Sequence, residues 1–232
     1  MIKIYFFSLK GLIFTLNFVK IIQIIIELYV EENPLKKLVI KTALITLASL
    51  IGAMTIAFGA TAICAPGFTA GFFDGVGNYS AAVFFYERQY NKTRDVDDLV
   101  VLVDNIDYRW DLNRAEKYLN LLLAHVDFDD FCAQNQNGFS QKEYYYGNYA
   151  LVLAKNNSFS VALGVSTIYV NGSGYTKYNP FRVLATDYAA ISSAQLNEIL
   201  DKLTELSTKI TDQTQLQYLN DDISNITNQL KG

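Results

Sequence analysis

The longest hydrophobic stretch of the chain lies between residues 38 and 63. It reads LVIKTALITLASLIGAMTIAFGATAI, and the 22 residues that follow Lys41 carry no charge. Because an α-helix rises ~1.5 Å per residue, ~20 residues cross a hydrocarbon core of ~30 Å. A buried core helix is seldom apolar on every face over such a length. We therefore predict a transmembrane helix within residues 38–63, inside an anchor segment that covers residues 35–65.

The basic residues around this stretch predict its orientation. Three lysines lie at its start, namely Lys36, Lys37 and Lys41, and the next basic residue is Arg88. Cytoplasmic flanks of membrane helices are enriched in lysine and arginine. We expect the N-terminal flank in the cytoplasm and everything after Ala65 to be extracytoplasmic.

A cleavable signal peptide is the alternative to a retained anchor. Residues 60–62, Ala-Thr-Ala, resemble a small-residue cleavage site. The apolar stretch, however, is longer than the ~7 to 15 residues of a signal core, which favours retention.

Residues 1–34 form an apolar segment with a polar stripe. The polar positions recur at sevens, threes and fours, as one face of a helix requires. They are Lys3, Lys10, Asn17, Lys20, Glu27 and Glu31. Three interpretations stay open: a second spanning helix, which would make the chain two-pass, an interfacial helix along the bilayer, or a start codon assigned too early.

A patterned segment follows Pro66-Gly67. Its characteristic residues are Gly77-Asn78-Tyr79, Ala82, Phe85-Tyr86-Glu87 and Tyr90. This pattern resembles the turn and second helix of a tetratricopeptide repeat, G-D/N-Y-x-x-A-x-x-x-Y. The physical chemistry agrees, since a glycine ends the first helix and the small Ala82 lets two helices approach closely. Val83, Tyr86 and Tyr90 also share one helical face.

A second copy can be aligned on Ala115. This alanine lies 33 residues after Ala82, close to the ~34-residue period of the family. We expect its first helix over residues 96–109, with Asp95 as the N-cap and acidic residues in the first turn. Trp110 stands where the repeat has its turn glycine.

A third copy is expected over residues 144–170. Its small residues are Ala150 in the first helix and Ala162 in the second, with a turn at residues 155–157. Ala162 lies 47 residues after Ala115, so the chain contains an insertion. We place the extra residues around 132–140 and expect an extended connection there, because that stretch is polar and contains an Asn-Gly pair.

Residues 171–232 depart from the repeat. We expect Asn171-Gly172-Ser173-Gly174 to break the helical pattern, a new helical run from Pro180, and another after Ser193. The last helix has apolar residues at threes and fours, as a helix with one covered face requires. They are Leu216, Leu219, Ile223, Ile226 and Leu230. We interpret residues 171–232 as a degenerate hairpin and a C-terminal capping helix.

The resemblance, which covers most of residues 66–170, implies an all-α fold: a short α-solenoid of helical hairpins behind a membrane anchor. Such arrays commonly bind peptides or protein segments on their concave face. Tyrosine is frequent in binding hot spots, so four tyrosines are candidates for contact with a protein or peptide partner. They are Tyr144, Tyr145, Tyr146 and Tyr149.

Charge and cysteine content narrow the possible functions. Residues 1–65 carry six lysines and three glutamates, a net +3, whereas residues 66–232 carry 13 basic and 20 acidic residues, a net −7. An acidic domain repels phosphate backbones, so we expect no nucleic-acid binding. Cys64, Cys132 and the single histidine are too few for a zinc site of the usual type, and we expect the two cysteines not to pair.

One cluster contains residues that could carry chemistry: His125, Asp127, Asp129 and Asp130. It could serve a metal-dependent or hydrolytic enzyme, which is the alternative function. Acids and a histidine between two helices are equally what capping requires. The sequence has no Gly-rich phosphate loop, GxSxG elbow or HExxH motif, so we expect no enzyme activity, no cofactor and no metal.

The sequence therefore predicts a membrane-anchored extracytoplasmic helical-repeat protein that mediates protein–protein interaction or assembly. A further alternative is a small integral-membrane subunit of a larger complex, in which residues 12–30 also span the bilayer.

Overall fold

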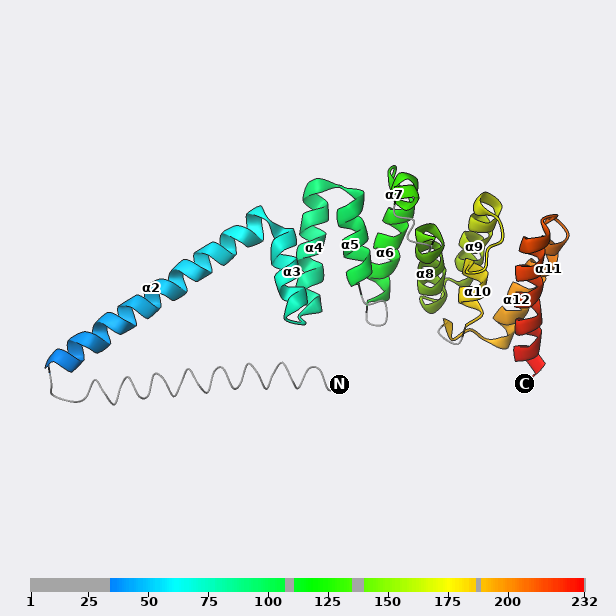
Figure 1. The fold of residues 1–232 in the computed structure, drawn as a ribbon. Coiled ribbons are helices and arrows are strands. Elements are labelled where there is room, and N and C mark those ends of the chain that lie inside the picture. Colours follow the sequence, from blue (N-terminus) through cyan, green and yellow to red (C-terminus); the bar gives the residue numbers. More distant parts are fainter. Residues whose placement is uncertain (1–33, 107–110, 135–139, 187–188, 232) are drawn as a thin grey trace. The chain divides into compact units, whose positions relative to one another are not determined.

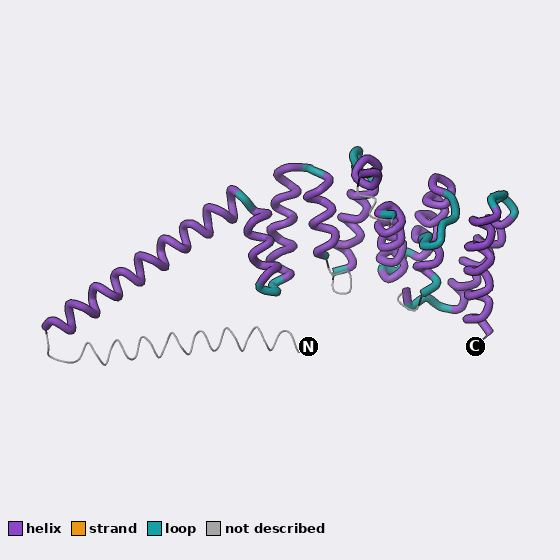
Figure 2. Tube along the Cα trace, in the orientation of Figure 1, coloured by secondary structure: helices purple, strands orange, loops and turns teal. Residues whose placement is uncertain are grey.

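The computed structural model describes residues 34–106, 111–134, 140–186 and 189–231. The chain divides into two compact units, Met1–Cys64 and Ala65–Gly232. All regular elements in these four ranges are helices, as the ribbon and the Cα trace show (Figures 1 and 2). The all-α fold class is confirmed. The predicted segments 66–170 and 171–232 both lie in the second unit.

The first unit contains α2 (Pro34–Cys64), a single uninterrupted helix. In the described part of the chain, Lys41–Cys64 is the one helix long and apolar enough to cross a membrane by length and composition. Three of its threonines bond within the helix: the hydroxyls of Thr42, Thr46 and Thr55 donate to the carbonyl four residues earlier. The three interpretations of residues 1–34 concern residues that, apart from Pro34, lie outside those that the structure describes.

The second unit begins with the helices α3 (Pro66–Gly75) and α4 (Tyr79–Thr93). Gly77 has a φ of +75°, in the region that favours glycine. The backbone N–H of Asn78 reaches back to the Phe73 carbonyl (2.8 Å), and its side chain accepts from the Ala81 N–H at the start of α4. Ala82 is fully buried. The turn and the small residue therefore act as predicted.

The next pair is α5 (Val96–Asn105) and α6 (Leu112–Leu123). Asp95 caps α5 as predicted, accepting from the Asp97 N–H at 2.8 Å. The predicted end of this helix at residue 109 is wrong, because Ile106 takes an extended conformation and buries its side chain in the core. Residues 107–110, including Trp110, lie outside the description. Ala115 on α6 is buried as expected.

The insertion contains a helix, α7 (Phe128–Gln134). The expected extended connection over residues 132–140 is therefore wrong at its start. Phe128 and Cys132 are one helical turn apart and both are buried, which explains why this stretch is helical. Cys132 carries a free thiol.

The third pair is α8 (Gln141–Lys155) and α9 (Phe159–Ser173). Ala150 and Ala162 are fully buried, and the chain turns at residues 156–157, as predicted. The expected break at Asn171 comes later, since α9 continues to Ser173 and ends at Gly174, whose φ is +81°.

Three helices complete the unit: α10 (Pro180–Leu184), α11 (Ser193–Ser207) and α12 (Gln213–Lys231). On α12, Leu219 and Ile226 are buried on one face, as the spacing predicts.

Two hydrophobic cores hold the second unit together, and α8 contributes to both. Tyr145 and Val152 pack into the core formed with α4 to α7. Ala150 and Leu153 pack into the core formed with α9 to α12. Because one helix serves both cores, the two halves of the unit are joined through α8.

Candidate functional site

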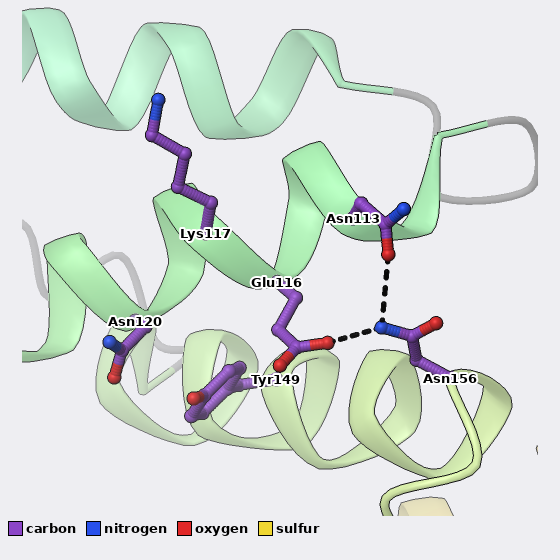
Figure 3. Close-up of a pocket in the computed structure, with 6 residues that line it drawn as sticks. All are labelled: Asn113, Glu116, Lys117, Asn120, Tyr149 and Asn156. Carbon is purple, nitrogen blue, oxygen red and sulfur yellow. Dashed lines mark hydrogen bonds between the residues drawn. The ribbon is translucent and has the colours of Figure 1, made fainter.

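An open groove lies between α6 and α8 (Figure 3). Its volume is about 290 Å³. The lining is polar apart from one aromatic ring, and it consists of Asn113, Glu116, Lys117, Asn120, Tyr149 and Asn156.

α6 has one polar face and one apolar face, and its polar face lines the groove. Asn113, Lys117 and Asn120 lie at i, i+4 and i+7 and are exposed on one face. The opposite face carries Ala115 and Leu122, which pack into the core. α6 therefore presents a polar face along its length, and Asp111 fixes where the helix begins by accepting from the Arg114 N–H at 3.1 Å.

Two hydrogen bonds close one end of the groove. The Asn156 amide at the end of α8 donates to Asn113 Oδ1 (3.2 Å) and, in a shorter contact, to Glu116 Oε2 (Figure 3). Since Asn156 belongs to the turn between α8 and α9, these bonds hold that turn against α6. The Glu116 carboxylate is thereby oriented at the base of the groove.

Tyr149 supplies the aromatic part of the lining. Burial, followed by the negative charge of Glu116, raises the pKa of its phenol. The hydroxyl therefore stays protonated and able to donate a hydrogen bond at neutral pH. Lys117 turns to Tyr118 instead, with its Nζ 3.1 Å from the hydroxyl and 4.5 Å from the ring centroid. The groove thus offers amides, a carboxylate and a phenol to a ligand.

The four tyrosines proposed as partner contacts occupy different environments. Tyr149 lines the groove, and Tyr144 is 41% exposed. Tyr146 is half-buried and packs on Tyr169, with ring centroids 5.2 Å apart. Tyr145 is buried, and its hydroxyl donates to both carboxylate oxygens of an aspartate on α5, Asp104, at 3.2 Å. The partner role of all four stays a prediction.

The histidine cluster lies at the junction of α6 and α7, as its sequence position indicates. The Asp127 N–H donates to His125 Nδ1 (3.2 Å), so Nε2 is left to donate to the Arg94 carbonyl at 3.1 Å. Asp129 pairs with Lys142 at 2.8 Å. Both ring nitrogens of His125 therefore bond to backbone groups. These hydrogen bonds join the turn between α6 and α7 to the turn between α4 and α5. Across the described ranges, no three His, Cys, Asp or Glu side chains are grouped to hold a metal ion.

Most of the groove was not among the sequence-predicted site residues. Only Tyr149 was a candidate. The missed residues on α6 share a polar helical face, and this signal is the same as that of any solvated face. No protein-family model matches the chain, and neither a curated protein nor a solved structure matches it. Its function is therefore inferred from its own residues.

Proposed function

We propose that this chain is a membrane-anchored helical-repeat protein that binds a protein or peptide segment outside the cytoplasm. The observation that carries the proposal is the groove between α6 and α8, an open polar hollow in a helical unit that follows directly after an apolar helix of membrane-spanning length. α2 acts as the anchor, and the groove binds the partner. The lysines before the apolar stretch favour an extracytoplasmic second unit.

The arrangement of helices supports a tetratricopeptide-like array. α3 packs on α4, α5 on α6 and α8 on α9, and successive pairs meet through α4–α5 and α6–α8. The second helices of the three pairs carry Ala82, Ala115 and Ala162, each buried. Small residues at these positions let the helices of each hairpin approach closely. Each hairpin then leaves an apolar flank for the next one to cover, which is how a solenoid is built.

The lining of the groove fits an extended polypeptide. Asn113 and Asn120 carry side-chain amides, which can donate and accept as peptide groups do. The protonated Tyr149 donates, and Glu116 accepts from a backbone N–H or from a basic side chain. Residues 66–232 have a net charge of −7, which attracts a partner segment with basic residues.

Photo-crosslinking in native membranes tests this assignment. A photoreactive phenylalanine is placed at Tyr149, and a matched variant carries it at Tyr218, another half-buried tyrosine, on α12. We expect a light-dependent adduct with a protein or peptide from position 149 and none from position 218. Equal products from both positions, or none from either, would contradict the proposal.

A charge reversal refines the same experiment. Glu116→Lys should abolish the adduct at position 149, because the acceptor at the base of the groove is replaced by a cation. Glu198→Lys changes an exposed acid on α11 by the same charge and should leave the adduct unchanged. An adduct that survives Glu116→Lys would show that the partner does not use the groove.

A further inference from the structure

The first hairpin of the second unit exposes an aromatic surface. Phe68 is 74% exposed and Phe72 is 53% exposed, and the two lie four residues apart on the same side of α3. Gly71 and Gly75 are exposed on that side too and have no side chain, so within α3 only the two rings project from it. Phe84 on α4 is 51% exposed.

These rings form a connected series. Phe72 contacts Phe73 (centroids 5.6 Å apart), Phe73 stacks on Phe85 (5.5 Å), and Phe85 contacts Phe84 (5.2 Å). The series therefore runs from α3 across to α4. Arg88, one turn after Phe84, lies at its edge with the guanidinium 5.9 Å from the Phe84 centroid.

The hairpin is unusually rich in such residues. Of the twelve large hydrophobic residues that are exposed in the described part of the second unit, five lie between residues 66 and 87: Phe68, Phe72, Val76, Tyr79 and Phe84. Over the same residues the only charges are those of Asp74 and Glu87. A contiguous exposed apolar surface of this kind marks a site of contact with a membrane or another protein.

The position of the hairpin in the chain favours the membrane. Only Ala65 separates Cys64, the end of α2, from Pro66, the start of α3, so at most about 7 Å of chain lies between them. The candidate span of 24 residues is ~36 Å long, more than a hydrocarbon core of ~30 Å requires. If α2 spans the bilayer, α3 must begin at its surface.

We propose that this hairpin lies in the outer interface of the bilayer, with Phe68, Phe72 and Phe84 at the boundary between headgroups and acyl chains. Helices with Trp, Phe or Leu on one face lie along that boundary with the apolar face buried. Arg88 at the edge of the ring series is placed to contact a lipid phosphate. The second unit is then held against the membrane. This inference rests on the proposed anchoring by α2.

Spin labels on the full chain in phosphatidylcholine liposomes test the proposal. Cys64→Ser removes the exposed cysteine, whereas Cys132 is retained, because burial raises the pKa of its thiol to about 11 and leaves it unreactive at neutral pH. Single labels are introduced through Phe68→Cys and Phe72→Cys. Ile168→Cys, at a 64% exposed site on α9, is the matched control, and Leu50→Cys reports on α2.

We expect the labels at positions 68 and 72 to collide with oxygen and to lose access to a water-soluble nickel reagent, while position 168 shows the opposite behaviour. If the labels at 68 and 72 are as accessible to the nickel reagent as the label at 168, while the label at 50 lies inside the bilayer, this inference is overturned and the anchor stays intact. Labels shielded from both reagents would mean that a protein surface covers the hairpin, which also overturns it. A water-exposed label at position 50 would reject the anchor, and the inference with it.

Discussion

Asp222 on α12 is a buried carboxylate that bonds the last helix to the segment around α10. It is 3% exposed and accepts from the Tyr175 hydroxyl (2.8 Å), the Asn179 amide (3.3 Å) and Arg182 Nε (2.7 Å). Asp222→Ala would remove all three bonds at once. The resulting loss in the free energy of unfolding depends on how exposed each donor is.

The Tyr175 hydroxyl, on a residue that is 1% exposed, would lose its Asp222 acceptor, and leaving it unsatisfied costs about 1–3 kcal/mol. Asn179 keeps a bond to the Thr176 carbonyl, so its loss is about 1 kcal/mol. The Arg182 side chain is 31% exposed and turns to water, which limits its loss to about 0–1 kcal/mol. We expect a total of about 2–5 kcal/mol, and about half of that for Asp222→Asn, which retains an acceptor oxygen.

Amide hydrogen exchange of α12 peptides measures this effect locally, since an array of helices need not unfold in one step. A loss of about 2–5 kcal/mol corresponds to exchange faster by about 30- to 4,000-fold. Asp221→Asn is the matched control, because Asp221 is the exposed neighbour on the same helix and should change stability by less than about 0.5 kcal/mol. Equal exchange in Asp222→Ala and Asp221→Asn would show that the three bonds of Asp222 do not stabilise α12.

Three further changes have defined outcomes. Gly77→Ala should lower the free energy of unfolding by about 1–2 kcal/mol, because Gly77 has a φ of +75°. Gly71→Ala, within α3 and with open space around the added Cβ, should instead raise it by about 0.5–1 kcal/mol. Denaturant titration of the two variants measures both effects. Ala150→Leu should cost about 1–3 kcal/mol or more by overpacking, against little change for the exposed Ala194→Leu, in the same titration. Burial, then the Glu143 charge, raises the pKa of Tyr169 to about 12 from a usual value of about 10. The folded state holds the phenol proton of Tyr169 more tightly than the unfolded state does. This difference stabilises the fold below pH ~10, and the stabilisation should be lost as the pH rises towards ~12. Thermal unfolding measured against pH would detect the loss.

Features that depend on local chemistry could be predicted from the sequence. Asp95 caps α5, Gly77 lies in the turn that follows α3, and Ala82 is buried, because a cap, a positive φ and a close helix contact each require particular residue types. The apolar helix could be predicted for the same reason, since length and composition alone define it.

Features that depend on a few tertiary contacts could not be predicted. α7 is held by Phe128, Phe131 and Cys132, and three apolar residues within about one turn are too few to show a period. The partners of Asp222 lie 40 to 47 residues earlier, so no local pattern reveals them. In the groove, Tyr149 was a candidate because tyrosine is frequent in binding sites, but Asn120 and its neighbours look like any solvated face.

We propose that α2 anchors a second unit that lies outside the cytoplasm. Protease protection on intact cells, with tags after Met1 and at Gly232 and with blotting of membrane and soluble fractions, tests it most directly. We expect a C-terminal tag that stays with the membrane and is digested by protease added outside. A C-terminal tag that is protected until the cells are permeabilised, or that appears in the soluble fraction, would contradict it.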